Sequence, residues 1–578
     1  MNKQLLKLLQ LKIKNSQMPQ REIAKQLGFS LGKTNKLLEQ LKENLLVDQN
    51  FLLTNKGKQY VTQHKPRRAI ILAAGYGMRM VPINMEEPKG LLKVKGEPLI
   101  ERLIKQLQAK EINDIKIVVG FMKEHYEYLI DKYHIQLVVN PHYSEWNNIY
   151  SLYLVQNQLS NSYVLPCDVW FKENPFSTLE DNSWYMFTEQ TSSDSQWRIG
   201  PRGTVKKVKE NGNCMVGIAY LDIESGQTIG RLLTNRVMNR KRLNEFWESV
   251  LDDHNRFILE AYLVKNIHYT EINSYEELRD LDSNSDHLKN DAIEAIKNTL
   301  KVHSREINHI QVLKKGMTNR SFIFSCQGDR YIMRIPGRGT KKLINRQHEY
   351  DVYQIIKELP YVEHTLYLNP KNGYKLTQFI ENSRNCDANN WNDVRQCMNL
   401  LKEMHQSSLK VGHTFDLQQQ IEMYEQLRDG QSAYRDYEDT KKRIEELLTL
   451  VNGLDKEWTL CHIDANADNF VFDNQGNVYL IDWEYAGMQD PHVDIAMFAI
   501  YSMYNQQQID QLISIYFDGQ VKLGVKYKIY AYIAICGLLW SNWCEYKQSL
   551  GMDFGEYSLA QYRYAKEYSR KALEFWKG

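Results

Sequence analysis

The sequence predicts a multidomain α/β protein in three parts, at residues 1–65, 67–290 and 295–578. Its length of 578 residues is too great for a single hydrophobic core. In the middle of the chain, apolar strand-like runs alternate with helix-like runs, which is typical of a mostly parallel sheet with helices on both faces. In the last part, a strand pair joined by a Gly turn precedes a mainly helical region, which predicts a small sheet lobe followed by a helical lobe.

The charge and cysteine patterns exclude some classes of protein. The formal net charge is only +2, so the whole molecule does not bind polyanions by bulk charge. The eight cysteines form no Cys-x-x-Cys pair and read as reduced thiols of a cytoplasmic protein. The apolar stretch 529–540 is too short to cross a bilayer and predicts a buried helix, so no membrane segment is expected.

Residues 1–65 have the outline of a winged helix-turn-helix. Helical apolar periods meet at Gly28, and residues 46–61 alternate like two strands around a turn. This part contains twelve Lys or Arg against four Asp or Glu, which suits contacts with DNA phosphates. The recognition helix would present Lys33, Thr34, Asn35 and Lys36 to the major groove. The alternative is a docking or dimerisation module that does not bind DNA.

The middle part begins with a strand and a Gly-containing loop. The predicted strands and helices are at 68–75, 98–112, 114–120, 123–133, 135–140 and 162–169. Small residues after the first strand let backbone N–H groups approach the phosphates of a nucleotide, and the residues expected to do so are Leu72, Ala73, Ala74, Gly75 and Gly77. Arg79 and Lys89 would neutralise the α-phosphate under attack and the departing pyrophosphate.

The segment Leu72–Glu101 resembles the sugar-phosphate nucleotidyltransferase superfamily, and within it the bacterial phosphocholine cytidylyltransferases of the Lic type. The resemblance implies CTP as nucleotide, phosphocholine as acceptor, and Mg²⁺ held by Asp168 and by Asp253, with Asp252 as the alternative.

Quaternary ammonium groups are usually bound by aromatic faces, and the candidates here are Tyr143, Trp146, Tyr150 and Trp197. The chain departs from the family at Gln196, where an acid is usual, and at Leu221, where Trp is frequent. Phosphoethanolamine or an aminophosphonate therefore stays open as the acceptor.

The last part contains a pattern of phosphoryl transfer. In His-x-Asp-x-x-x-x-Asn, Asp464 can receive the proton of a substrate hydroxyl while Asn469 reaches a metal. Asp482, after an apolar strand, would supply the metal carboxylate. The turn 314–322, with Gly316 and Asn319, would cover the phosphates of ATP. Further candidates for the nucleotide site are Arg334 in place of the usual lysine and Glu349 as its partner.

Residues 314–543 resemble the choline/ethanolamine kinases and the related aminoglycoside phosphotransferases. The resemblance implies that Asp464 is the catalytic base and that Asn469 and Asp482 bind Mg²⁺. It also implies an aromatic cage for the ammonium, for which the candidates are Tyr485, Trp540 and Trp543 with the acid Glu484.

The two resemblances together predict a bifunctional enzyme. It would phosphorylate choline with ATP and transfer CMP from CTP to phosphocholine, giving CDP-choline and pyrophosphate. One alternative is the same chemistry on ethanolamine or an aminophosphonate. Another is a DNA-binding regulator that uses both domains as sensors, but a sensor needs no complete acid sets at Asp464, Asn469 and Asp482 or at Asp168 and Asp253.

Overall fold

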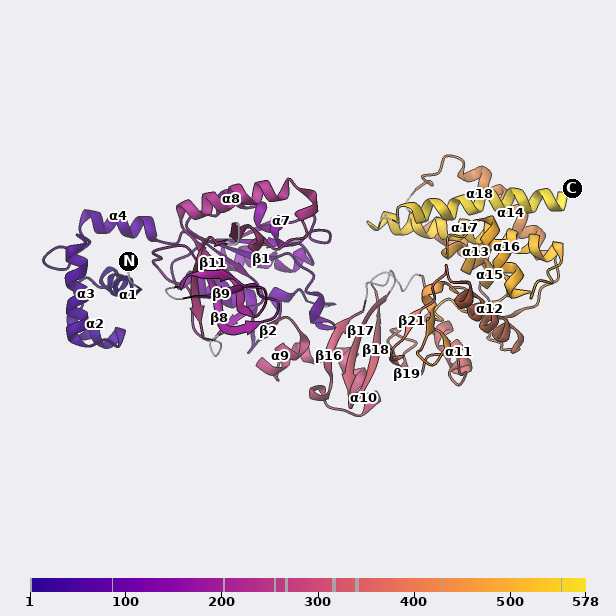
Figure 1. Cartoon of the computed structure of the whole chain (residues 1–578), viewed down its shortest axis with the longest axis horizontal. Helices are drawn as coiled ribbons and strands as arrows, with labels where there is room; N and C mark the ends of the chain where they lie inside the picture. The colour runs from indigo at the N-terminus through magenta and orange to yellow at the C-terminus, as the bar shows by residue number, and fades with distance from the viewer. Residues whose placement is uncertain are drawn as a thin grey trace. The chain divides into compact units, whose positions relative to one another are not determined.

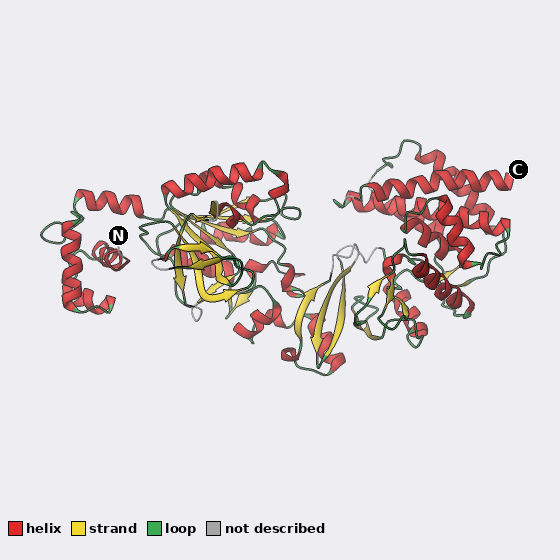
Figure 2. Ribbon diagram, in the orientation of Figure 1, coloured by secondary structure: helices red, strands yellow, loops and turns green. Residues whose placement is uncertain are grey.

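The computed structural model describes residues 3–85, 87–200, 203–253, 256–265, 269–313, 319–337, 343–428, 430–552 and 554–577. The chain forms two compact units, Met1–Glu294 and Ala295–Gly578 (Figure 1). The first unit contains four N-terminal helices and a large mixed sheet, and the second contains a small sheet and a helical lobe (Figure 2).

The N-terminal helices are α1 (Lys3–Lys14), α2 (Gln20–Leu27), α3 (Leu31–Glu43) and α4 (Asn55–His64). The predicted helices are present, but the predicted pair of strands is wrong. Only one antiparallel bridge, Val47 to Leu53, forms in the described part of this segment. The Thr54 hydroxyl then accepts a hydrogen bond from the Gly57 N–H and begins α4. Gly57 lies against the Leu46 backbone, where a Cβ would meet the carbonyl oxygen at 2.0 Å.

The predicted DNA-contacting positions on α3 differ in exposure. Lys33, Asn35 and Lys36 are exposed, but Thr34 is fully buried and its hydroxyl donates to the Ser30 carbonyl. Thr34 is therefore a packing residue of the helical core, and the prediction that it faces a DNA groove is wrong.

The N-terminal helices pack on the segment 177–181 of the same unit. The Gln10 amide donates to the Ser177 hydroxyl at 2.5 Å, and the Tyr60 hydroxyl donates to Asp181. Leu179 is buried in the hydrophobic core of these helices. The helices are thus joined to the sheet by both apolar and polar contacts.

A seven-stranded sheet forms the centre of the first unit, in the order β14-β8-β11-β6-β1-β4-β5. The central strand β1 runs parallel to both β4 and β6, and β11 is antiparallel to its neighbours. The prediction of a mostly parallel sheet is confirmed. The strands are β1 (Arg68–Ala73), β4 (Asp114–Val119), β5 (Gln136–Val139), β6 (Ser162–Pro166), β8 (Trp184–Ser192), β11 (Gly212–Leu221) and β14 (Glu260–Val264).

Helices and smaller sheets complete this unit (Figure 1). The helices are α5 (Leu99–Gln108), α6 (Tyr128–Tyr133), α7 (Asn148–Tyr153), α8 (Ile223–Val237) and α9 (Tyr275–Leu281). The short strands are β2 (Lys93–Val94), β3 (Glu97–Pro98), β7 (Val169–Phe171), β9 (Trp197–Ile199), β10 (Val205–Lys207), β12 (Asp252–Asp253), β13 (Arg256–Phe257) and β15 (Tyr269–Glu271). The antiparallel pairing of β15 with β7 places Glu271 opposite Val169, next to Asp168. The helix α10 (Asp291–Leu300) crosses the boundary between the units.

The second unit begins with a five-stranded sheet in the order β16-β17-β18-β20-β19. Its strands are β16 (Asn308–Val312), β17 (Asn319–Cys326), β18 (Asp329–Pro336), β19 (Thr365–Leu368) and β20 (Lys375–Gln378). The helix α11 (Arg346–Ile356) follows β18 in the chain, and Asn345 caps it by accepting from the N–H groups of Gln347 and His348. The predicted small sheet lobe is confirmed.

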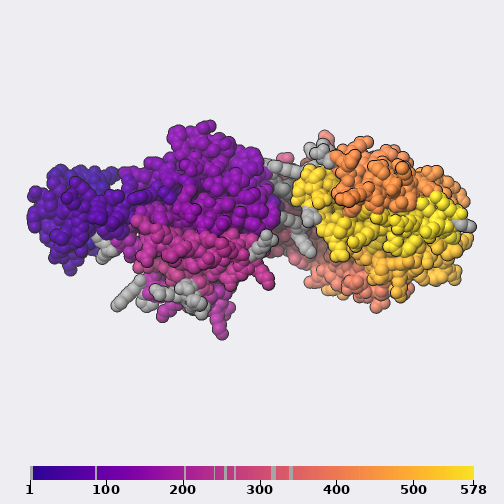
Figure 3. All heavy atoms as spheres, turned by 90° about the horizontal axis from the view of Figure 1, so that it is seen from above, coloured from indigo at the N-terminus to yellow at the C-terminus, as the bar shows by residue number. Residues whose placement is uncertain are grey.

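The helical lobe contains α12 (Trp391–Gln406), α13 (Leu417–Leu427), α14 (Tyr437–Asn452), α15 (His492–Tyr501), α16 (Gln506–Tyr516), α17 (Leu523–Ser549) and α18 (Glu556–Lys577). Short strands cross it at β21 (Arg384–Asn385), β22 (Thr459–Cys461), β23 (Phe470–Phe472), β24 (Val478–Leu480) and β25 (Gly487–Gln489). In the space-filling view, the yellow C-terminal residues lie side by side with the orange residues of the same unit (Figure 3).

Helix α17 is the core helix of this lobe. Among the described residues it is the one helix whose length and composition would suffice to cross a membrane. However, 72% of its most apolar window is buried inside the protein, as in the core helix of a globular domain. The prediction of a buried helix at 529–540 is confirmed, because every residue from Ile529 to Trp540 is buried.

Two candidate active sites

A cavity of about 540 Å³ opens where β1 and β6 end, and both strands end at the same edge because they are parallel. The loop after β1 forms one wall, and all five predicted nucleotide-contacting positions from Leu72 to Gly77 line it. Gly77 has φ of +59°, and a Cβ there would lie 3.3 Å from the Lys89 Cβ. Glycine at this position therefore lets the loop turn tightly against Lys89.

Lys89 and Asp168 meet inside this cavity. The Lys89 ammonium donates to Asp168 Oδ2 and, at 2.7 Å, to Asn273 Oδ1. The Arg79 guanidinium, although exposed, donates to the same Asn273 oxygen at 3.4 Å. Asp168 Oδ1 is buried and has no hydrogen-bond partner among the described residues. The site thus brings together two cations and a carboxylate with an unused oxygen.

The acid beside Asp168 is Glu271, which the sequence did not reveal. Burial, and next the charge of Asp168, raises the pKa of Glu271, so the two carboxylates repel each other. The predicted second metal acid was Asp253, whose side chain lies outside the described residues. The alternative, Asp252, forms an ion pair with Lys207 at 2.6 Å. Glu271 lies near Asp168 because β15 pairs with β7, and the assignment of Asp253 as a metal acid stays a prediction that the structure does not test.

The predicted amine-binding aromatic residues divide into two groups. Tyr143 and Trp146 line the cavity. Tyr150 contacts Trp146 edge to face, with ring centroids 4.6 Å apart. Trp197 is 8% exposed, packs against Phe257 in the hydrophobic core and does not line this cavity, so its role in substrate binding stays a prediction. Leu221, where the family often has Trp, is fully buried and does not line the cavity.

Sequence reasoning also missed Glu248. Tyr185 donates to its Oε1 at 3.1 Å, while Oε2 is buried without a partner in the part of the chain that the structure describes. Burial raises the pKa of Glu248 to about 7. Its only sequence signal is an acid directly after Phe246-Trp247. Glu248 lies behind the cavity, because a Cβ on Gly217 would touch both Pro166 of its lining and Glu248.

In the second unit, strand β18 and helix α11 build an ion-pair network. Arg334 donates to both oxygens of Glu349, at 2.5 and 2.9 Å, and to Asp482 at 3.3 Å. Arg346 donates to Glu349 at 2.8 Å and to Glu484 at 3.0 Å. Burial is the largest effect on the pKa of Glu349 and would raise it, but the charge and hydrogen bond of Arg334, together with the charges of Lys375 and Arg346, lower this pKa to about 2. The predicted pairing of Arg334 with Glu349 is present.

The catalytic loop brings Asp464 and Asn469 into contact. The Asn469 amide donates to Asp464 Oδ2 at 3.0 Å, and the Asn466 amide donates to Oδ1 at 3.1 Å. Burial, and to a smaller extent Asp482, raises the pKa of Asp464 to about 7, against a hydrogen bond from Tyr501 that lowers it. Asp482 has φ of +65°, an unusual backbone conformation for a non-glycine residue, which is often found at functional sites.

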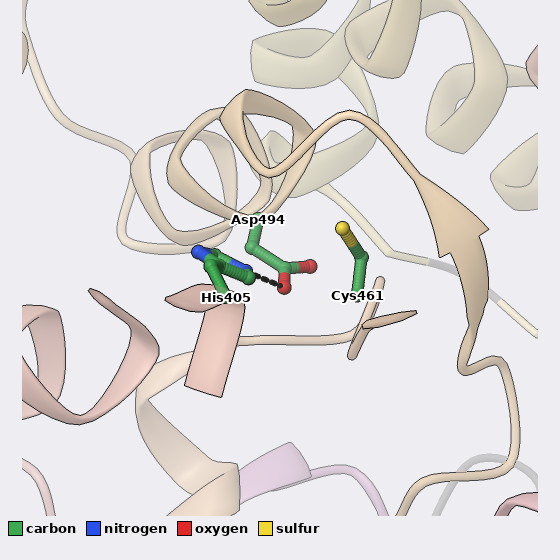
Figure 4. Close-up of side chains that lie close together, drawn as sticks. All are labelled: His405, Cys461 and Asp494. Atoms are coloured by element: carbon green, nitrogen blue, oxygen red, sulfur yellow. Dashed lines mark hydrogen bonds and ion pairs between the residues drawn. The ribbon is translucent and has the colours of Figure 1, made fainter. Parts of the chain in front are cut away.

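Asp494 lies between His405 and Cys461 (Figure 4) and is hydrogen-bonded to the start of this loop. It accepts the backbone N–H groups of His462 at 2.9 Å and Ile463 at 2.7 Å, and His405 contacts it at 2.9 Å. Ile463 has φ of +69°, a strained conformation for a β-branched residue, which these hydrogen bonds stabilise. His462 is fully buried against the Ile481 carbonyl, as expected for a loop anchor.

The predicted amine cage is an aromatic cluster beside Asp464. Tyr485 and Trp543 both stand edge-on to Trp540, with centroids 5.9 and 5.4 Å away. Glu484 and Tyr485 line a cavity of about 650 Å³. The Glu484 carboxylate, however, is bound by Arg346, so the prediction of an acid reserved for the substrate ammonium is not supported.

The predicted phosphate-covering turn lies outside the described residues at 314–318, which include Gly316, and the side chain of Asn319 lies outside them as well. The structure therefore does not test these predictions.

Comparison with known proteins identifies both domains. Residues 69–179 match the model of the MobA-like NTP transferase domain, and residues 309–521 match that of the phosphotransferase enzyme family. Choline-phosphate cytidylyltransferase of Streptococcus pneumoniae is 34% identical over 192 residues, 32% of this chain and 84% of the relative. 2-Aminoethylphosphonate cytidylyltransferase of Lancefieldella rimae is 30% identical over 195 residues, 32% of this chain and 79% of the relative.

The crystal structure of choline kinase LicA from Streptococcus pneumoniae aligns with 29% identity and a TM-score of 0.43, covering 48% of this chain and 98% of that one. The cytidylyltransferase of Streptococcus pneumoniae is matched over 84% of its own length, and the region 69–179 that matches the NTP transferase model includes the loop after β1 and Asp168. The chain therefore belongs to the nucleotidyltransferase family that includes these cytidylyltransferases, and joins to it a kinase-like domain of the phosphotransferase enzyme family.

Proposed function

We propose that this chain makes CDP-choline in two steps: it phosphorylates choline with ATP at Asp464 and transfers CMP from CTP to phosphocholine at Lys89 and Asp168. The observation that carries this proposal is the presence of two separate acid sets, one in each compact unit, each beside aromatic side chains. The product of the kinase step is the acceptor that the transferase step requires, so one chain contains both consecutive reactions.

In the kinase step, the hydroxyl oxygen of choline attacks the γ-phosphorus of ATP, its bond to ADP breaks, and Asp464 takes the hydroxyl proton. Arg334, fixed by Glu349, is placed to neutralise phosphate charge. Asn469 and Asp482 fit a Mg²⁺ ion because they offer an amide oxygen and a carboxylate beside Asp464. Held by these residues, such an ion would supply positive charge against the phosphates of ATP during transfer.

In the transferase step, a phosphate oxygen of phosphocholine attacks the α-phosphorus of CTP, and pyrophosphate leaves. Backbone N–H groups of the loop after β1 cradle the phosphates, and Lys89 and Arg79 neutralise them. Asp168 and Glu271 fit a Mg²⁺ ion, because Asp168 Oδ1 has no partner and Glu271 is repelled by it. An ion held by these two acids would relieve their repulsion and supply positive charge against the phosphates of CTP.

The choice of choline rests on the aromatic side chains at both sites. A trimethylammonium cannot donate N–H hydrogen bonds, so a site that selects it depends on ring faces. Tyr143 and Trp146 provide them in the first unit, and Tyr485 and Trp540 in the second. Ethanolamine or an aminophosphonate is the alternative acceptor, since the Lancefieldella relative acts on 2-aminoethylphosphonate.

We propose the cytoplasm as the location, because both nucleotide substrates are cytoplasmic and the cysteines are free. DNA is not proposed as a partner, because neither matched family model includes residues 1–65; Lys33, Asn35 and Lys36 are exposed on α3, and DNA binding stays a prediction.

The test is to incubate the full chain with ATP, CTP and Mg²⁺ and with choline, ethanolamine or 2-aminoethylphosphonate, followed by mass analysis of the products. Choline should give phosphocholine and then CDP-choline. Formation of a CMP adduct only from 2-aminoethylphosphonate would reject the choline assignment and keep the transferase. Absence of any phosphorylated amine would reject the kinase assignment.

A further inference from the structure

Helix α17 carries a lysine next to the aromatic cluster of the kinase site. Lys547 follows Trp543 by four residues, and its side chain is 3% exposed. Its ammonium lies 5.6 Å from the centroid of the Trp543 ring and 6.0 Å from that of Tyr546. A lysine ammonium is strongly hydrated, so its burial against aromatic rings is costly unless a carboxylate compensates.

No such carboxylate is bonded to Lys547 among the described residues. Two other lysines of the same helix show the usual arrangement: Lys526 pairs with Asp510 at 2.9 Å, and Lys528 pairs with Asp490 at 2.5 Å. Burial lowers the pKa of Lys547, and the more distant charge of Glu484 opposes this shift. Because Arg346 and Arg334 surround the Glu484 carboxylate, it compensates Lys547 only in part.

The ring that Lys547 approaches belongs to the proposed amine cage. Trp543 stands edge-on to Trp540, which in turn faces Tyr485 and Tyr501. Tyr501 reaches the catalytic Asp464 by a hydrogen bond. The Lys547 ammonium therefore lies against Trp543, one of the rings of the proposed cage. A substrate ammonium that binds in this cage would be repelled by the charge of Lys547.

We propose that Lys547 is a specificity-determining residue of the kinase site, which weakens the binding of a permanently cationic alcohol relative to an uncharged alcohol of the same shape. The inference rests on the proposed function, because it requires that the aromatic cluster bind the substrate head group. Cation–π attraction from the rings favours choline, and Lys547 opposes it. The difference between the attraction from the rings and the repulsion from Lys547 determines how tightly choline binds.

The expected size follows from Coulomb's law. For a substrate ammonium bound on the face of Trp543 opposite to Lys547, about 9 Å away, repulsion between the two charges would weaken binding by roughly twentyfold at an effective dielectric constant of about 20. Removing the charge should therefore lower the KM for choline by about tenfold or more, while the KM for an uncharged analogue should stay nearly constant.

The experiment compares choline with 3,3-dimethylbutan-1-ol, in which a carbon replaces the nitrogen, as kinase substrates of the full chain. The readout is the ratio of kcat/KM for choline to kcat/KM for the uncharged alcohol. Lys547→Met should raise this ratio about tenfold, and Lys547→Arg, which keeps the charge, should leave it within about twofold of the unsubstituted protein. A purely structural role would change both substrates alike.

The matched control is Lys526→Met, on the same helix. Lys526 also lies 5.6 Å from an aromatic ring, that of Tyr530, but it is paired with Asp510. Its substitution should not change the ratio. An unchanged ratio in Lys547→Met, or an equal change in Lys526→Met, would overturn the proposal. If the unsubstituted protein phosphorylates none of the amino alcohols, the proposed function itself has failed, which is a distinguishable result.

Discussion

The substitution Glu349→Gln tests whether the buried ion pair with Arg334 prepares the kinase site for ATP. Arg334 is 4% exposed and makes two of its hydrogen bonds to Glu349. Without that carboxylate charge, the nearest acids for Arg334 are Asp482 at 3.3 Å and Glu484 at 3.8 Å. The guanidinium should move toward Asp482 and neutralise the carboxylate that is proposed to bind the metal.

The size of the effect follows from the pKa of Glu349, which the network lowers from 4.5 to about 2. At about 1.4 kcal/mol for each pKa unit, the charged form gains roughly 3 kcal/mol in the folded protein. This agrees with the roughly 3–5 kcal/mol measured when one partner of a buried ion pair is removed. If Arg334 acts on the ATP phosphates, kcat/KM for ATP should fall about a hundredfold, since about 1.4 kcal/mol corresponds to a factor of ten.

The assay measures ADP release with choline at varied ATP, and CMP transfer to supplied phosphocholine in the same preparation. Glu363→Gln is the matched control: Glu363 is also buried and pairs with Lys375 at 2.8 Å, but it makes no contact with Arg334. Glu349→Gln should impair ATP use far more than the control, and both variants should keep CMP transfer. Equal losses in both variants, or unchanged ATP kinetics in a folded Glu349→Gln protein, would refute the role given to Arg334.

Three further predictions concern single side chains. Asp464→Ala should abolish choline phosphorylation and leave CMP transfer to supplied phosphocholine; loss of both activities in a folded protein would show that the two sites are not separate. Lys89→Ala should lower the CMP-transfer rate by about a hundredfold or more, and unchanged kinetics would exclude charge neutralisation by Lys89. Glu248→Gln should raise the thermal midpoint in calorimetry at pH 8 and not at pH 4. The pKa of Glu248 is raised to about 7 in the folded protein, so its contribution to folding stability is fully present below pH 4.5 and is lost as pH rises through 7. The loss amounts to up to about 3 kcal/mol. An equal gain in thermal midpoint at both pH values would contradict this prediction.

Local patterns were enough to predict the parts of each site that are contiguous in the chain. The loop after β1 and the pair Asp464 and Asn469 each depend on a short segment with its own hydrogen bonds. Glu271 and Asn273 follow Asp168 by about a hundred residues and reach it only because β15 pairs with β7. No periodicity in the sequence specifies that pairing, so the proximity of Glu271 to Asp168 could not be found from spacing.

The wrong prediction at residues 46–61 has a local cause. Alternating apolar residues favour strands, but Thr54 is also a good N-cap, and its hydroxyl binds the Gly57 N–H. Gly57 can then approach the Leu46 backbone more closely than any other residue could. Capping and close packing together outweigh the period-two pattern. Of the expected hairpin, only the bridge between Val47 and Leu53 forms in the described part of this segment.

In both sites a phosphate-binding cation is paired with a carboxylate that a divalent cation would also use. Lys89 donates a hydrogen bond to Asp168, and Arg334 donates one to Asp482 at 3.3 Å, so each acid contacts the cation of its own site. A nucleotide phosphate offers the cation a new partner and releases the acid, which links nucleotide binding to metal binding at each site. Arg334 keeps a second acid, Glu349, and Lys89 keeps Asn273 as a hydrogen-bond partner and the nearby charge of Glu271. Each cation therefore retains a second negative partner when it leaves the first acid, and nucleotide and metal binding should be linked at both sites.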